Sequence, residues 1–129
     1  MAIAEGKTLP FKDPKTVDTS ILETFPYQGP NQWIRYTTNE FSAVCPFSGL
    51  PDFATVVVEY IPDQYCVELK SLKYYYLSYR DVGIFQEDMT AKVYQDLAQL
   101  LKPKEFKLTV TYQTRGGIDT VTSIDSKDQ

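Results

Sequence analysis

The sequence predicts an α+β fold in which two helices cover one face of an antiparallel sheet. Segments that alternate apolar and polar residues lie in both halves of the chain, and two segments with helical spacing lie between them. The predicted order is therefore ββααββ, with one hairpin on either side of a helical pair. The length of 129 residues suits a single domain.

The first predicted hairpin occupies residues 31–61. NQWIRYTTNEF, which starts at Asn31, is rich in aromatic and β-branched residues and therefore favours a strand. After a turn-rich segment, ATVVVEYI (54–61) alternates with period two. One face of this strand is fully apolar and consists of Ala54, Val56, Val58 and Tyr60.

The middle of the chain predicts two amphipathic helices. ELKSLKYYYLSYR (68–80) carries apolar side chains three or four positions apart, although its run of tyrosines would also suit a strand. A second stripe with helical spacing follows DVG and ends before Pro103. The first stripe consists of Leu69, Leu72, Tyr76 and Tyr79, and the second of Met89, Val93, Leu97, Leu100 and Leu101.

The second hairpin is predicted near the C-terminus. EFKLTVTYQ (105–113) alternates without interruption, the glycines after Arg115 indicate a turn, and IDTVTSI (118–124) is the last strand. Residues 1–30, in contrast, are rich in Pro, Lys, Asp and Thr and show no sustained period. We therefore expect an N-terminal arm that is partly ordered at best, followed by one folded domain over residues 31–126.

Composition argues against several classes of function. A net charge of −4 and a pI near 4.8 argue against a general binder of nucleic acids or anionic membranes, which needs surplus Lys and Arg. No run approaches the roughly 18 apolar residues of a membrane span, and the first residues lack the pattern of a signal peptide. We expect a cytoplasmic protein with free thiols. With two cysteines and no histidine, a Cys/His pair is excluded and no metal site is expected.

The stretch AVCPFSGLPDFA (43–54) is the main candidate for chemistry. Cys45 follows a predicted strand and precedes a rigid turn rich in Pro and Gly, where a loop can present a reactive group. A thiol needs an electropositive or hydrogen-bonding neighbour to react near neutral pH, and Asp52 is the nearest candidate for a paired proton carrier. The alternative is that Cys45 packs as a small hydrophobe, as we expect for Cys66, and that Asp52 is a turn residue.

Charged residues elsewhere suggest ligand contacts. Lys70 and Lys73 share a helix face, and Arg115 adds a third cation beside two glycines. Such a set can hold phosphates in a chain without the glycine-rich nucleotide motifs, although a solvated basic face would look the same. Glu87, near the start of the second helix, can accept hydrogen bonds from two adjacent N–H groups of a guanine-like ring. Alternatively, the helix dipole alone favours an acidic residue at this position.

Together, these motifs resemble the QueF family of NADPH-dependent 7-cyano-7-deazaguanine reductases in its short, single-domain form. The resemblance extends over residues 31–124 and rests on the joint presence of the motifs at the spacing of the family. The chain departs from the family at Gln86, where histidine is usual, and glutamine cannot exchange a proton. The motifs are Cys45-Pro46 through Gly49, Pro51-Asp52-Phe53-Ala54, Glu68-Leu69-Lys70-Ser71-Leu72-Lys73, Gln86-Glu87 and Arg115-Gly116.

The resemblance implies a tunnelling fold (T-fold) with this ββααββ order, in a homo-oligomer of two stacked rings, a decamer, with the sites between subunits. It also implies that a nitrile reductase converts 7-cyano-7-deazaguanine to 7-aminomethyl-7-deazaguanine with two NADPH, a step of queuosine biosynthesis for transfer RNA modification. Cys45 would form a thioimide with the nitrile carbon, and Asp52 would protonate the nitrile nitrogen.

The resemblance further implies which residues bind the two ligands. The substrate-binding residues would be Val67, Glu68 and Leu69 through their backbone, together with Gln86 and Glu87. The residues that bind the phosphates of NADPH would be Lys70, Lys73 and Arg115.

Two other functions remain open. A QueF-like amidinotransferase uses the same thiol chemistry on a nitrile in transfer RNA without NADPH, but the negative net charge and the intact Lys70/Lys73 motif disfavour it. A non-catalytic T-fold protein that binds a purine or pterin would require Cys45 and Asp52 to be merely structural.

Overall fold

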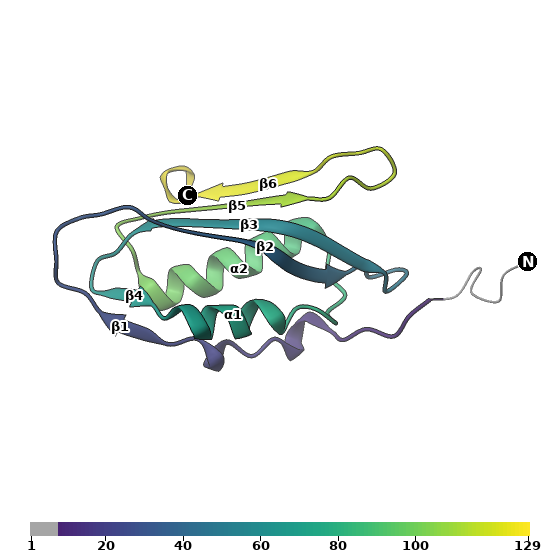
Figure 1. Cartoon of the computed structure of the whole chain (residues 1–129), viewed down its shortest axis with the longest axis horizontal. Coiled ribbons are helices and arrows are strands. Elements are labelled where there is room, and N and C mark those ends of the chain that lie inside the picture. Colours follow the sequence, from purple (N-terminus) through teal and green to yellow (C-terminus); the bar gives the residue numbers. More distant parts are fainter. Residues whose placement is uncertain (1–7) are drawn as a thin grey trace, which may run out of the picture.

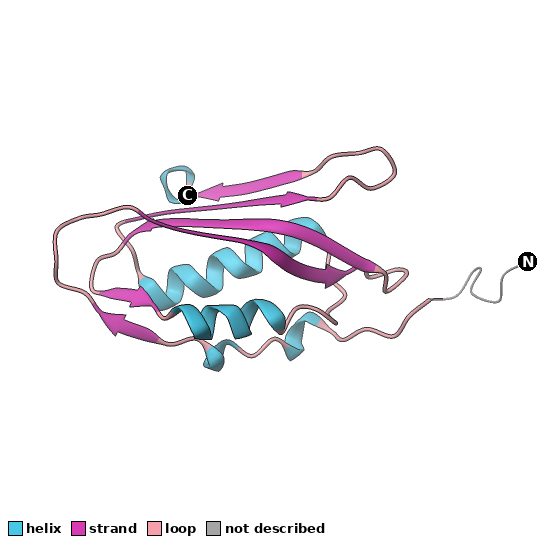
Figure 2. Cartoon of the chain, in the orientation of Figure 1, coloured by secondary structure: helices cyan, strands magenta, loops and turns pink. Residues whose placement is uncertain are grey.

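The computed structural model describes residues 8–129 and shows two helices on one face of a four-stranded antiparallel sheet (Figure 1, Figure 2). The main elements, in chain order, are β2 (Ile34–Val44), β3 (Pro51–Ile61), α1 (Leu69–Leu77), α2 (Gln86–Leu101), β5 (Glu105–Tyr112) and β6 (Val121–Asp125). The strands are ordered β2-β3-β5-β6 in the sheet, so each hairpin forms one half of it. The predicted α+β class and the ββααββ order of these elements are confirmed.

The two central strands form the inner face of the sheet. Their alternation turns every second side chain of β3 and β5 toward the helices, where these side chains are almost completely buried. The register places Val56 opposite Val110 and Val58 opposite Leu108, so that β-branched and aliphatic side chains pack across the strands. The apolar face predicted for residues 54–61 is therefore confirmed.

The stripe predicted for the first helix is partly wrong. Leu72 and Tyr76 are buried as expected, but Leu69 is 55% exposed and Tyr75, which was not in the stripe, is fully buried. The buried face of α1 is thus rotated from the predicted one, and Leu69 instead lines a groove between α1 and β2. Tyr79 lies in the turn that follows α1, and its side chain is fully buried.

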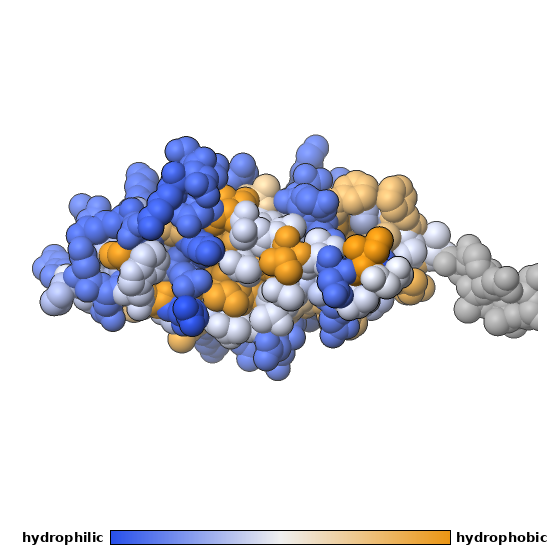
Figure 3. Space-filling model, turned by 90° about the horizontal axis from the view of Figure 1, so that it is seen from above, coloured by the Kyte–Doolittle hydropathy of each residue, from blue (hydrophilic) through white to orange (hydrophobic). Residues whose placement is uncertain are grey.

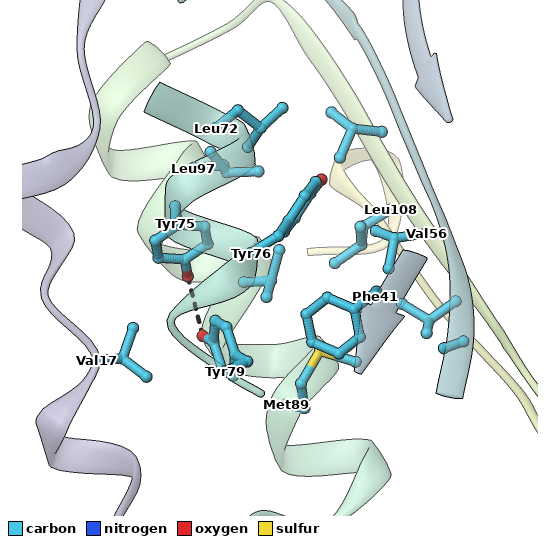
Figure 4. Close-up of a cluster of buried hydrophobic side chains, with 14 of the residues drawn as sticks. Val17, Phe41, Val56, Leu72, Tyr75, Tyr76, Tyr79, Met89, Leu97 and Leu108 are labelled. Carbon is cyan, nitrogen blue, oxygen red and sulfur yellow. Dashed lines mark hydrogen bonds between the residues drawn. The ribbon is translucent and has the colours of Figure 1, made fainter. Parts of the chain in front are cut away.

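The tyrosines of α1 make a testable contribution to stability (Figure 4). The Tyr75 hydroxyl lies 2.6 Å from the Asp96 carboxylate and 3.0 Å from the Tyr79 hydroxyl, whereas the buried Tyr76 hydroxyl has no hydrogen-bond partner among residues 8–129. We expect Tyr75→Phe to lower the free energy of unfolding by about 1–3 kcal/mol, and the matched Tyr76→Phe to be neutral or stabilising. Urea denaturation of both variants measures this, and equal losses would contradict it.

The segment before Asn31 differs from the expected arm. Within residues 8–30, Val17 and Leu22 are 8% and 7% exposed and belong to the hydrophobic core, and a short strand pairs with the segment that precedes α1. Such short elements carry no period, so the sequence pattern could not reveal them. The remaining elements are the 3-10 turns η1 (Pro14–Thr16), η2 (Thr19–Ile21) and η3 (Ser126–Asp128), and the antiparallel pair β1 (Thr24–Pro26) and β4 (Tyr65–Val67).

Candidate active site

The loop between β2 and β3 presents Cys45 at one end of the sheet. The Cys45 N–H donates to the Leu50 carbonyl at 2.9 Å, and the Cys45 carbonyl accepts from the Gly49 N–H at 2.8 Å. Gly49 has a φ of +72°, a conformation that glycine adopts without steric cost. These bonds close a tight loop directly after the last residue of β2, which fixes the position of the thiol.

Asp52 is the second residue of β3, rather than a turn residue before it, and is 4% exposed. It occupies the same face of the strand as Ala54, so its carboxylate points toward the helix layer. The Arg115 guanidinium lies 3.3 Å from this carboxylate, and the Gln86 side-chain amide donates to both of its oxygens at 3.4 Å. The buried carboxylate is therefore compensated by a cation and an amide.

Four parts of the chain converge on one open pocket of about 370 Å³. The β2–β3 loop contributes the thiol and β3 the carboxylate, the N-terminal turn of α2 contributes an amide and a second carboxylate, and the β5–β6 turn contributes a guanidinium. The predicted site residues that line this pocket are Cys45, Asp52, Gln86, Glu87 and Arg115. The sequence predicted each of these residues separately, and the structure brings them together.

The environment of Cys45 favours the thiolate. The backbone N–H groups of Ser48 and then Phe47 hold the pKa of the Cys45 thiol at about 7, below its ordinary value, and Arg115 adds a smaller effect in the same direction. A substantial fraction of this thiol is therefore ionised at neutral pH, as a nucleophile requires.

The predicted turn after Arg115 places the guanidinium at the pocket. Arg115 and Ile118 exchange two backbone hydrogen bonds of 3.0 and 2.9 Å across Gly116 and Gly117, which have φ values of +58° and +76°. Two consecutive residues with positive φ form the tight hairpin turn that suits the twist of the flanking strands. Glycine is required here because other residues would be strained in both positions.

Three aromatic residues at this site were not predicted. Phe47 and Phe85 are 75% and 48% exposed and form an edge-to-face pair at the pocket, with ring centroids 5.5 Å apart. Tyr112 donates a hydrogen bond to the Gln86 carbonyl at 3.3 Å, and burial raises the pKa of its hydroxyl. The sequence signal that could have identified Tyr112 is its position at the end of an alternating strand.

Figure 3 shows hydrophobic side chains continuing to this end of the molecule, whereas the opposite end is mostly hydrophilic.

The remaining predicted residues do not line this pocket within one chain. Val67, Glu68 and Leu69 lie where β4 meets α1, at the opposite end of the long axis from the β2–β3 loop (Figure 1). The Glu68 carboxylate caps α1 by accepting from the N–H groups of Lys70 and Ser71 at 2.7 and 2.9 Å.

Lys70 and Lys73 also lie on α1, apart from Arg115. The Lys70 ammonium lies 5.9 Å from the centre of the Tyr74 ring. Lys73 and Arg80 line the groove of about 270 Å³ between α1 and β2, together with Leu69. The predicted set of three cations is therefore divided between two places in a single chain.

Comparison with known proteins identifies the family. Residues 51–129 match the model of the QueF family, which is described as QueF-like protein. A protein of Thermotoga petrophila is 50% identical over 127 residues, which cover 98% of this chain and 93% of that protein. The chain belongs to the QueF family. A second QueF relative, from Chloroherpeton thalassium, is 52% identical over 102 residues, 78% of this chain and 88% of that protein. Both relatives are named NADPH-dependent 7-cyano-7-deazaguanine reductase.

The QueF fold is also found among solved structures. The apo crystal structure of the archaeosine synthase QueF-Like has a TM-score of 0.70 and 26% identity, and the match covers 77% of this chain and 96% of that one. The tunnelling fold implied by the resemblance is thereby confirmed. Across residues 8–129 of this QueF protein, no helix is long and apolar enough to span a membrane.

Proposed function

We propose that this chain is an NADPH-dependent 7-cyano-7-deazaguanine reductase that acts in queuosine biosynthesis. The observation that carries the proposal is the shared pocket of Cys45, with its lowered pKa, and the buried carboxylate of Asp52. Sequence identities of 50% and 52% to proteins of that name support the proposal further.

The two side chains suit addition to a nitrile. Cys45 passes its proton to the Asp52 carboxylate, and its sulfur bonds to the nitrile carbon. Asp52 returns the proton to the nitrile nitrogen, which gives a neutral thioimide on the enzyme. Two NADPH molecules would each supply one hydride. After the first reduction the carbon–sulfur bond would break and the Cys45 thiolate would leave, and Asp52, once it has taken up a proton from solvent, would pass it to the nitrogen.

The other site residues fit the two ligands in different ways. Glu87 is exposed at the pocket and can accept adjacent N–H donors of the deazaguanine, and Gln86 can position the base while it holds Asp52. The paired rings of Phe47 and Phe85 offer an aromatic surface for a planar base. Lys73, beside Arg80 in the α1–β2 groove, and Arg115 at the pocket provide cations for NADPH phosphates, with Lys70 nearby on α1.

We propose that the working enzyme is a homo-oligomer, a decamer of two stacked rings, with each site built between subunits. This would explain why Val67, Glu68 and Leu69 lie at the opposite end of the chain from Cys45, because a neighbouring subunit would supply them. The N–H groups of Val67 and Glu68 already donate to the Tyr60 hydroxyl and the Glu23 carbonyl. A cytoplasmic location, free of nucleic acid and membrane partners, remains our prediction.

The alternatives are less well supported. The structural neighbour named archaeosine synthase is 26% identical, whereas the relatives named as reductases are about 50% identical over comparable or greater lengths. A non-catalytic binder gives no reason for a thiol of lowered pKa in the same pocket as a buried carboxylate.

The test is to count NADPH oxidised per nitrile. We expect the purified protein to oxidise two NADPH for each 7-cyano-7-deazaguanine consumed and to yield the primary amine. The loss of nicotinamide absorbance measures the oxidation. A covalent adduct without any NADPH oxidation would instead indicate nitrile chemistry without hydride transfer, and would contradict the reductase.

A further inference from the structure

Residues 8–12 lie against the back of the loop that carries Cys45. The Leu9 N–H donates to the Ser48 carbonyl at 2.8 Å. The Leu9 main chain also approaches Gly49 so closely that a Cβ at Gly49 would lie 2.3 Å from the Leu9 carbonyl oxygen. The absence of a side chain at Gly49 therefore permits this contact, in addition to the positive φ.

This segment is anchored next to the loop. The Lys12 N–H donates to the Asp81 carbonyl at 2.6 Å, and the Lys12 carbonyl accepts from the Gly83 N–H at 2.9 Å. Val82 in turn accepts from the N–H of Val44 at 3.0 Å, one residue before Cys45. Three segments thus lie side by side, with parallel bridges between Lys12 and Val82 and between Val44 and Gly83.

Side-chain packing strengthens the anchor. The Phe11 ring covers Gly83 so tightly that a Cβ at Gly83 would lie 2.2 Å from a ring carbon. Further along the chain, Val17 and Leu22 are buried in the core. The backbone of Leu9 is therefore held in place from its C-terminal side.

The anchored segment restrains the peptide that follows Ser48. The oxygen of this peptide accepts from Leu9, and its nitrogen, that of Gly49, donates to the Cys45 carbonyl. The N–H groups of Ser48 and Phe47, which lie on the N-terminal side of this peptide, are the backbone groups that lower the pKa of the Cys45 thiol. Movement of Ser48 within the loop would displace these donors relative to the sulfur, and the bond from Leu9 to the Ser48 carbonyl opposes that movement.

We propose that Leu9 is a positioning residue for Cys45, because its backbone N–H holds Ser48 in place through the Ser48 carbonyl and thereby keeps the Phe47 and Ser48 N–H groups next to the sulfur. Its catalytic consequence rests on the proposed function, in which Cys45 is the nucleophile. Residues 8–12 are then part of the active-site machinery, although none of their side chains lines the pocket.

The test compares Leu9→Pro, which removes the N–H, with Leu9→Ala, which keeps it. The rate of Cys45 alkylation by iodoacetamide is measured against pH on the full chain, with the modified peptide identified by mass spectrometry. The wild type and Leu9→Ala are expected to reach half of the maximal rate near pH 7. For Leu9→Pro we expect this midpoint to rise by about one pH unit, so that the rate at pH 7 falls about fivefold.

An unchanged midpoint in a folded Leu9→Pro protein would overturn the proposal, as would an equal shift in both variants, since the latter would implicate the side chain. If Leu9→Pro does not fold, deletion of residues 1–9 removes the same donor without the proline ring, and its midpoint decides. Alkylation requires neither nitrile nor NADPH, so its pH midpoint can be interpreted even if the reductase assignment fails. Likewise, NADPH oxidation by the wild type tests the reductase assignment whatever the Leu9 variants show.

Discussion

Replacing Cys45 with alanine is expected to abolish both the covalent adduct and nitrile reduction. Addition of a thiol to a nitrile loses no atoms, so the wild-type protein should gain the full mass of 7-cyano-7-deazaguanine when NADPH is omitted. Without the thiolate the nitrile cannot become a thioimide, and we expect NADPH oxidation to fall at least about a thousandfold. Intact-protein mass spectrometry and nicotinamide absorbance measure the two effects.

The matched control is Cys66→Ala, the other cysteine of the chain. Cys66 is 3% exposed in β4, away from the pocket, so this variant should keep the adduct and most of the turnover. Cys45 lies in a loop and is only partly buried, so its replacement should leave the thermal unfolding transition almost unchanged. An adduct that persists in Cys45→Ala would exclude this residue as the nucleophile.

The main sheet could be predicted because burial on one face requires alternation. Strand β5 alternates without interruption, and its buried positions are those expected from the sequence. The pair β1 and β4 could not be found in this way, because three residues are too few to establish a period. The same is true of the hydrogen bond from Leu9 to Ser48, since the positive φ of Gly49 is enough to explain the glycine there and the residue does not indicate which segment packs against it.

The site was predictable to the extent that it is local. Cys45 and Asp52 come together because Val44 pairs with Pro51, and a hairpin loop of this length follows from the turn residues between them. Arg115 was grouped with the lysines of α1, but the structure pairs it with Asp52. That contact depends on where the β5–β6 turn lies relative to the β2–β3 loop, which is a property of the assembled sheet.

Gln86 bears on how protons move at the site. Its amide lies 3.4 Å from both oxygens of Asp52, so it can hold the carboxylate in place. An amide does not exchange its proton as an imidazole does, and the chain contains no histidine. Among the side chains placed at the pocket, Asp52 is therefore the group best situated to carry the proton between Cys45 and the nitrile nitrogen.

Replacing Asp52 with asparagine should accordingly slow both adduct formation and turnover by about 10²–10⁴-fold, the range expected for loss of a general acid–base group. Asparagine has nearly the same size and can still bond to Gln86, so substrate binding should change far less than the rate. The matched control is Asp63→Asn, which removes a charge from the exposed turn between β3 and β4 and should keep full activity. Stopped-flow NADPH oxidation and timed mass spectra measure both steps. If Asp52→Asn retains more than about a tenth of the wild-type rate, water rather than Asp52 delivers the proton.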